Sequence, residues 1–177
     1  TDYCGVMSVS IRCLTGESEH GKDERLGDTP GSQSGQAALS SNMRPMLGVL
    51  GGMGPLATVD FLRKLVEATP AKTDQDHIPI VARFCPEVPD RVDALLNAGP
   101  SPEAALVAAA RSLEQAGARA IAMPCNTAHA WADAIAAAVN IPLLHIVDAS
   151  LAAAAYHSPG KGLRQLGILA TQGTLAS

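Results

Sequence analysis

The feature that most constrains this chain is a regular alternation of short apolar runs with alanine- and leucine-rich amphipathic stretches, which starts at Met46. The apolar runs have the length of strands buried on both faces, and the stretches between them have the length of helices. The expected strands are residues 46–50, 78–84, 119–123, 141–146 and 165–169. The expected helices are residues 55–68, 90–98, 101–117, 126–139 and 148–156. This alternation predicts a parallel, doubly wound α/β sheet.

The residues before this alternation have a different composition. Residues 1–44 are rich in Ser, Gly, Asp and Glu and lack apolar periodicity, so we expect a disordered or poorly ordered leader. We expect residues 45–160 to form one α/β lobe. Residues 161–177 are expected to be the first strand of a second lobe that the chain does not complete.

An internal similarity supports that division. Residues 47–58 and 166–177 are identical at 6 of 12 aligned positions. We interpret the similarity as an internal repeat, with chance likeness between two strand-to-helix starts as the alternative. On this interpretation the last strand lacks its lobe, and its exposed apolar edge should promote dimerisation or aggregation.

Composition and charge argue against several classes of function. The net charge is −4 and the basic residues are scattered, which does not suit a nucleic-acid partner. No apolar run reaches the roughly 18 residues of a membrane span, and the N-terminus lacks the pattern of a secretion signal. The four cysteines show neither a Cys-x-x-Cys pair nor zinc-ligand spacing, so we expect reduced thiols in the cytoplasm.

A glycine-rich turn follows the first expected strand. This glycine turn, residues 51–54, is followed by Pro55 at the first position of a helix. It matches neither the Gly-x-Gly-x-x-Gly pattern nor a Walker loop, which argues against a nucleotide site. Ligands of such sheets bind at the carboxyl ends of the strands. The turn is therefore a candidate site for backbone amides to meet a carboxylate, with simple strand-to-helix packing as the alternative.

Cys125 stands at the end of the third expected strand, directly before a helix. The amides and dipole of the first helical turn would stabilise a thiolate there, and a thiolate is suited to act as a general base. Asn126 and Thr127 add side-chain donors and favour carboxylate binding. The alternative is a small buried apolar cysteine, and residue chemistry alone leaves both interpretations open.

Arg91 and the histidines have less specific patterns. Arg91 is a candidate for bidentate binding of a second carboxylate, with a surface arginine at a helix start as the alternative. His129 lies four residues after Cys125, and we interpret it as a satisfied or exposed histidine rather than a catalytic one. His77 and His145 are interpreted as structural.

Five segments together resemble the cofactor-independent aspartate/glutamate racemases of the Asp/Glu/hydantoin racemase family, aspartate racemases above all. These segments are GGMGP (51–55), DQDH (74–77), PEVPDR (86–91), PCNTAH (124–129) and LATQGT (169–174). The resemblance implies two α/β lobes with one catalytic cysteine from each. One thiolate removes the α-proton and the other thiol returns a proton to the opposite face, without pyridoxal phosphate or a metal.

The resemblance also implies a role for each candidate residue. Cys125 is one of the two acid/base residues, and Arg91 holds the side-chain carboxylate of an acidic amino acid. The α-carboxylate is held by two side chains and by the glycine turn: Asn126, Thr127, Gly52, Met53 and Gly54. The full-length protein is expected to be a homodimer.

The chain departs from the family pattern at two points. No second-lobe cysteine is present, and Cys4 and Cys13 of the leader are not assigned its role. Cys85 stands where similar proteins more often carry a polar residue, which leaves substrate preference open. Two alternatives to an acidic amino-acid racemase therefore remain. One is an inactive fragment that binds a small carboxylate or a partner chain, and the other is a related Cα isomerase or decarboxylase.

Overall fold

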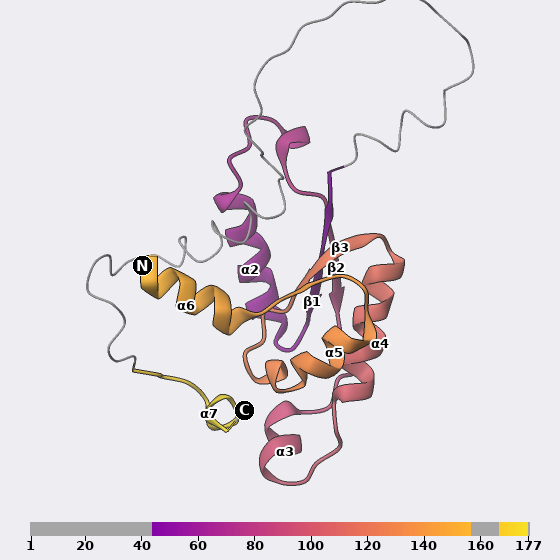
Figure 1. Ribbon diagram of the computed structural model, residues 1–177, viewed down its shortest axis with the longest axis vertical. Coiled ribbons are helices and arrows are strands. Elements are labelled where there is room, and N and C mark those ends of the chain that lie inside the picture. The colour runs from indigo at the N-terminus through magenta and orange to yellow at the C-terminus, as the bar shows by residue number, and fades with distance from the viewer. Residues whose placement is uncertain (1–43, 157–166, 177) are drawn as a thin grey trace, which may run out of the picture.

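The computed structural model describes residues 44–156 and 167–176, so the expected leader, apart from Arg44, lies outside the described residues. The described part contains one parallel sheet of four strands in the order β2-β1-β3-β4 (Figure 1). The strands are β1 (Met46–Gly51), β2 (Ile80–Phe84), β3 (Ala118–Ala122) and β4 (Leu143–Leu144). The first three lie where the apolar runs predict them, and the parallel α/β class is confirmed.

Helices connect successive strands, as the alternation predicts. The helices are α2 (Pro55–Ala68), α3 (Arg91–Leu96), α4 (Glu103–Gln115), α5 (Ala132–Ala138), α6 (Ile146–Tyr156) and α7 (Gln172–Leu175). Two short 3₁₀ helices, η1 (Asp74–Asp76) and η2 (Thr127–Trp131), complete the described elements. None of the described helices is long and apolar enough to cross a bilayer.

Local sequence signals set the ends of α3 and α4. The Asp90 carboxylate accepts a hydrogen bond from the Asp93 amide at 2.8 Å and caps the start of α3. The Ser101 hydroxyl accepts from the Glu103 amide at 3.3 Å at the start of α4. Gly117 follows α4 with a φ of +95°, a conformation that glycine adopts without a Cβ penalty.

The two faces of the sheet carry separate apolar clusters. On one face, Leu50 and Ile121 are fully buried with residues of α4 and α5, including Leu106 and Ile135. On the other face, Leu65 of α2 packs against a cluster of sheet residues, which are Leu47, Val49, Ala120 and Ala122. Figure 1 shows α2 on one side of the sheet and α4 and α5 on the other. The doubly wound arrangement is therefore confirmed.

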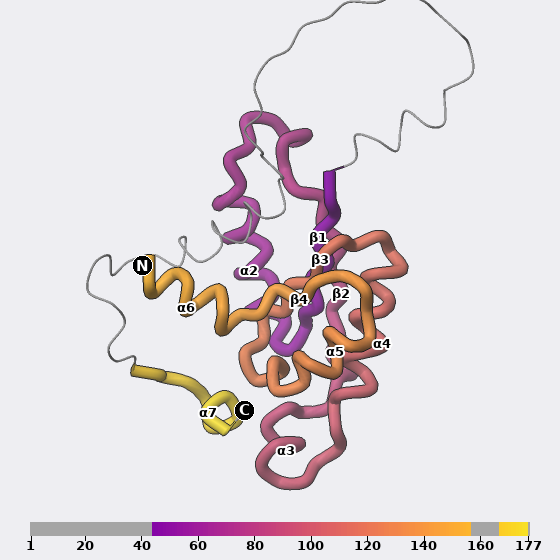
Figure 2. Tube along the Cα trace, viewed as in Figure 1, coloured from indigo at the N-terminus to yellow at the C-terminus, as the bar shows by residue number. Residues whose placement is uncertain are grey.

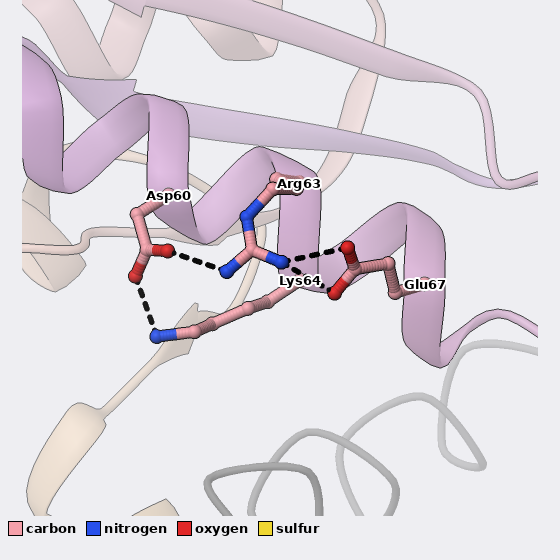
Figure 3. A network of polar contacts seen from close by, with 4 residues as sticks. All are labelled: Asp60, Arg63, Lys64 and Glu67. Carbon is pink, nitrogen blue, oxygen red and sulfur yellow. Dashed lines mark hydrogen bonds and ion pairs between the residues drawn. The ribbon is translucent and has the colours of Figure 1, made fainter. Parts of the chain in front are cut away.

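The outward face of α2 carries an ion-pair network (Figure 3). The Arg63 guanidinium donates to Asp60 at 2.8 Å and to Glu67 at 2.6 Å, and the Lys64 ammonium lies 2.5 Å from Asp60. The hydrogen bond from Lys64, followed by that from Arg63, lowers the pKa of the Asp60 carboxyl. All four side chains lie on the same helix and are solvent-exposed to a large degree, so the network supports α2 locally and contributes little to tertiary stability.

Two strand predictions near the C-terminus differ from the structure: the fourth strand forms but is shorter than expected, and the fifth is wrong over its described residues. The fourth strand is limited to Leu143–Leu144, since Pro142 has no amide to donate and α6 already begins at Ile146. Residues 167–169 of the expected fifth strand form no strand; residues 165–166 lie outside the described part. Ile168 and Leu169 are exposed, and no strand of the described residues pairs with them. The chain instead leads into α7, which packs against α3 (Figure 2).

Candidate active site

Three loops share the carboxyl edge of the sheet because all strands run parallel. β1 leads into the glycine turn, β2 leads to Cys85, and β3 leads to Cys125 through the Cys125 loop, residues 123–126. Since β1 pairs with both β2 and β3, the glycine turn follows the strand between the two that end at the cysteines. This edge is where ligands bind in open parallel sheets.

The glycine turn is organised by Thr58, a fully buried residue of α2. The Thr58 hydroxyl accepts a hydrogen bond from the Gly52 amide at 2.9 Å and donates to the Gly54 carbonyl at 3.2 Å. A Cβ on Gly51 would lie 2.3 Å from the Thr58 methyl carbon. The Gly52 amide is thus bonded inside the turn. The space beside the Gly54 Cα is open, because a Cβ there would have no atom within 4 Å. Sequence reasoning missed Thr58; its signal is a hydroxyl on the sheet-facing side of α2.

Cys85 lies at this edge but belongs to the core. Its side chain is fully buried, and burial raises the pKa of its thiol. Its amide donates to the Gly51 carbonyl at 3.0 Å. Gly52 has a φ of +88°, and a Cβ there would lie 2.4 Å from the Cys85 amide nitrogen. The backbone after β2 is therefore packed directly against the glycine turn.

Arg91 is half-buried and is not a simple surface arginine. Its Nη2 donates to the Met53 carbonyl at 3.3 Å, and its Nη1 donates to the Pro89 and Val88 carbonyls at 3.2 and 3.4 Å. Its buried Nε has no hydrogen-bond partner among the described residues. A guanidinium has five N–H donors, so these three bonds leave at least two for another acceptor. The structure thus attaches a cation with spare donors to the glycine turn.

The backbone after Cys125 differs from the α-helix that the sequence predicts. Residues Thr127–Trp131 form the 3₁₀ helix η2, and α5 begins only at Ala132. The His129 ring explains the difference, because its Nδ1 lies 2.8 Å from the Cys125 carbonyl that an α-helix would pair with the His129 amide. The His129 amide donates to the Asn126 carbonyl instead, at 2.9 Å. The expected α-helix dipole at Cys125 is therefore absent, and the thiol is half-buried.

His129 also connects the Cys125 loop to α6. Its Nε2 accepts a hydrogen bond from the Ile146 amide at 3.2 Å, which assigns the proton of the neutral ring to Nδ1. The ring is only 8% exposed, and burial is the main cause that lowers the pKa of His129. The interpretation of His129 as a satisfied histidine is confirmed. His145 packs edge-on against it with the ring centroids 4.6 Å apart.

The C-terminal segment reaches this site through Thr127. The hydroxyl oxygens of Thr127 and Thr174 lie 2.9 Å apart. Gly173 is buried, and a Cβ there would lie 2.7 Å from a Val92 methyl group and 3.1 Å from the Thr127 methyl group. The motif that includes Thr174 therefore contacts the site residue Thr127. Asn126 is exposed and makes no side-chain cap bond to η2.

Metal-ligating side chains do not gather in the described part of the chain: no group of three or more His, Cys, Asp or Glu is placed to hold an ion. The polar groups that do gather are donors. They are supplied by Arg91, by the exposed end of the glycine turn and by the loop that carries Cys125. Such a set is chemically suited to hold carboxylates next to a thiol.

Several known proteins are similar to this chain. Broad-specificity amino-acid racemase RacX of Bacillus subtilis (strain 168) is 34% identical to the chain over 110 residues, which are 60% of this chain and 48% of RacX. The chain thus spans about half the length of that curated relative. The structure of Picrophilus torridus aspartate racemase is 31% identical with a TM-score of 0.55, over 64% of this chain and 57% of that one.

The family comparison covers more of the chain than either relative. The family model for Asp/Glu/Hydantoin racemase matches residues 50–177, which include the glycine turn, Arg91, Cys125 and the segment around Thr174. The chain therefore belongs to the Asp/Glu/hydantoin racemase family.

Proposed function

We propose that this protein acts on an acidic amino acid as a cofactor-independent racemase, with Cys125 as an acid/base at Cα. The observation that carries the proposal is the bond between the Arg91 guanidinium and the Met53 carbonyl. It attaches a cation to the glycine turn at the sheet edge where β3 ends in the Cys125 loop. The family membership and the aspartate racemase among the similar structures support the choice of reaction.

We propose that the two carboxylates of the substrate bind to different donors. Arg91 takes the side-chain carboxylate through the N–H groups that its backbone acceptors leave unused. The α-carboxylate binds to Met53 and Gly54 of the glycine turn and to Asn126 and Thr127. Gly52 supports this turn, since its amide already donates to Thr58.

The Cys125 thiolate then removes the α-proton, and the electron pair delocalises into the carboxylate to give a planar carbanion. Racemisation requires a proton to return to the opposite face of this carbanion, from a second acid. By likeness to the family we propose a cysteine of a second lobe for that acid. Buried Cys85 is not proposed for it. If Cys125 itself returns a proton from solvent, the proton reaches the same face of the carbanion. The α-proton is then exchanged for a solvent isotope without inversion of the configuration at Cα.

The test is exchange of the aspartate α-proton for deuterium in D₂O, followed by NMR on each enantiomer separately. We expect exchange with the unmodified chain and a loss of about 10²-fold or more in Cys125→Ala, the lower range of general acid/base contributions. Cys85→Ala is the matched control and should retain exchange. Equal exchange in Cys125→Ala, or no exchange in the unmodified chain, would contradict the proposed role of Cys125 here.

The substrate class needs a separate comparison. Glutamate and alanine, tested beside aspartate, vary the length and the presence of the side-chain carboxylate. We expect Arg91→Lys to slow exchange of aspartate while leaving alanine unaffected, because a lysine cannot reproduce the planar fork of a guanidinium. An equal loss for both amino acids would argue against Arg91 as the side-chain carboxylate site and favour a broader or different Cα chemistry.

We also propose a cytoplasmic homodimer. The two cysteines of the described part are free thiols, which suits a reducing compartment. Val147 and Leu151 of α6 are apolar and exposed, which is consistent with burial against another chain. Light scattering tests the assembly, and a stable monomer at all concentrations would contradict it.

A further inference from the structure

His129 is a buried polar side chain that the proposed reaction does not use. It lies on η2 and connects Cys125, four residues before it, with Ile146, which follows β4 and lies 17 positions after it. Both ring nitrogens are engaged, one at 2.8 Å and the other at 3.2 Å. A histidine that served only to fill the core would not need to satisfy both of these backbone groups.

We propose that neutral His129 is a positioning residue for Cys125, which holds the Cys125 loop against the start of α6 and releases it when the ring is protonated. The Nδ1–H group donates to the Cys125 carbonyl, and Nε2 accepts from the Ile146 amide. This inference rests on the proposed function of Cys125. It assigns no contact between His129 and the substrate.

The release follows from the direction of the second bond. Ile146 is the first residue of α6, so its amide is one of the donors that a helix leaves without an intrahelical acceptor. A protonated ring would present an N–H group to this N–H group, next to the positive end of the helix dipole. The Ile146 bond must then break, whereas the Cys125 carbonyl can still accept from Nδ1. Protonation therefore separates the Cys125 loop from α6 and leaves His129 with the loop.

The surroundings of His129 limit what else can titrate with it. The ring of His145 lies against His129, and its positive charge disfavours a second charge on His129. Other ionisable groups on the elements around η2 are Arg91, Asp93, Asp133, Asp148 and the Cys125 thiol. Burial nevertheless has the larger effect on His129, ahead of any of these charges.

The first test is the tautomer of His129 in the folded protein. Nitrogen-15 NMR of the histidine side chains distinguishes a protonated Nδ1 from a protonated Nε2. We expect neutral His129 to carry its proton on Nδ1 at pH 8 or above. A neutral ring protonated on Nε2 would overturn the inference, because Nε2 could not then accept from Ile146. This measurement needs neither substrate nor a variant.

The second test is the rate at which iodoacetamide alkylates Cys125 between pH 5 and 8, followed by mass spectrometry of the peptide that contains it. A lone thiol loses tenfold in rate per pH unit below its pKa. Release of the loop should make Cys125 more accessible to iodoacetamide. The alkylation rates at low pH should therefore exceed those expected for a lone thiol by about fivefold, the factor that corresponds to the loss of one hydrogen bond. A plot of the alkylation rate against pH that shows the ionisation of the thiol and not that of His129 would overturn the inference.

Two variants locate the source of the extra rate. His129→Asn can place an amide nitrogen where Nδ1 lies but has no group that reaches Ile146, so it should show the roughly fivefold excess at every pH. His145→Asn is the matched control, since the His145 Nδ1 accepts a hydrogen bond from the nearby Val147 amide of α6. It should keep the ionisation and move it to higher pH. An ionisation that survives in His129→Asn would overturn the inference.

These measurements are independent of turnover. Loss of α-proton exchange while both hydrogen bonds of the His129 ring are intact would contradict the proposed function alone. An Nε2–H tautomer with exchange intact would contradict the positioning role alone.

Discussion

Cys85 and Cys125 both lie on loops that leave the same edge of the sheet, yet their surroundings differ. The Cys85 amide is held by a backbone bond to Gly51 of β1, and the thiol is fully buried. Cys125 is half-buried, and its carbonyl is held by the side chain of His129. The same residue type is thus part of the core after one strand and part of the candidate site after the next. The difference lies in which atoms fix each loop, not in the cysteine.

The largest expected contrast is in thiol reactivity. Under native conditions we expect iodoacetamide to modify Cys125 at least about a hundredfold faster than Cys85, because Cys85 must await a local opening of the core. Peptide mapping by mass spectrometry measures the two rates in the same sample. In denaturant the rates should converge. Similar native rates would show that the two loops are equally open, which would remove the contrast.

The close packing of the Cys85 backbone against the glycine turn, called here the backbone clamp, can be tested at Gly52. Gly52→Ala places a Cβ 2.4 Å from the Cys85 amide nitrogen at a φ of +88°, so we expect a loss of about 3 kcal/mol or more in the free energy of unfolding. Gly54→Ala is the matched control, because nothing lies within 4 Å of its Cβ, and it should cost less than about 0.5 kcal/mol. Urea denaturation compares them, and equal costs would contradict the clamp.

A third comparison places the same change at both cysteines. Cys85→Ser puts a hydroxyl into the core, where its desolvation should cost about 1–3 kcal/mol in the free energy of unfolding. Cys125→Ser should change that free energy by less than about 0.5 kcal/mol, since its side chain reaches solvent. Denaturant midpoints measure both changes. A larger loss at Cys125 would mean that its thiol, and not Cys85, supports the core.

Much of this fold could be predicted from the sequence because apolar periodicity and turn residues report local structure directly. β1, β3, α2 and α4 lie close to their expected bounds. The residues of β1 are buried almost without interruption, whereas the buried residues of α4 recur at helical spacing. The failures are the short β4 and the absent strand at residues 167–169. Their apolar runs have the composition of strands, but a strand also needs a partner, and pairing depends on distant parts of the chain.

The places of the candidate residues in the fold could be predicted, but not their hydrogen bonds. The positions of Cys125, Arg91 and the glycine turn follow from strand ends and from family motifs. The sequence does not show that Thr58 uses the Gly52 amide, that Arg91 binds the Met53 carbonyl, or that His129 replaces an α-helix with a 3₁₀ turn. Each of these depends on a side chain that bonds to a backbone group, for which sequence periodicity carries no signal.

The smallest expected effect is the pH dependence that His129 gives to folding. Its pKa in the folded protein is lowered from the ordinary value of 6.5, first by burial and also by the charge of His145. Below pH 6.5 the unfolded chain therefore binds more protons than the folded one, so the free energy of unfolding rises with pH through this window. The stability is fully present above pH 6.5 and is lost as pH falls through the folded pKa.

Urea denaturation at intervals from pH 5 to 7.5 measures this loss. His129→Asn should flatten the curve in that window, because asparagine does not titrate. Asp60→Asn serves as the control: the Asp60 pKa is already lowered from 3.8 by Lys64 and Arg63, so its contribution changes only in more acid solution (Figure 3). A His129→Asn curve with the same slope as the unmodified chain would assign the pH dependence elsewhere. The hydrogen bond between His129 and the Cys125 carbonyl would then depend on pH as little as the backbone bond between Cys85 and Gly51.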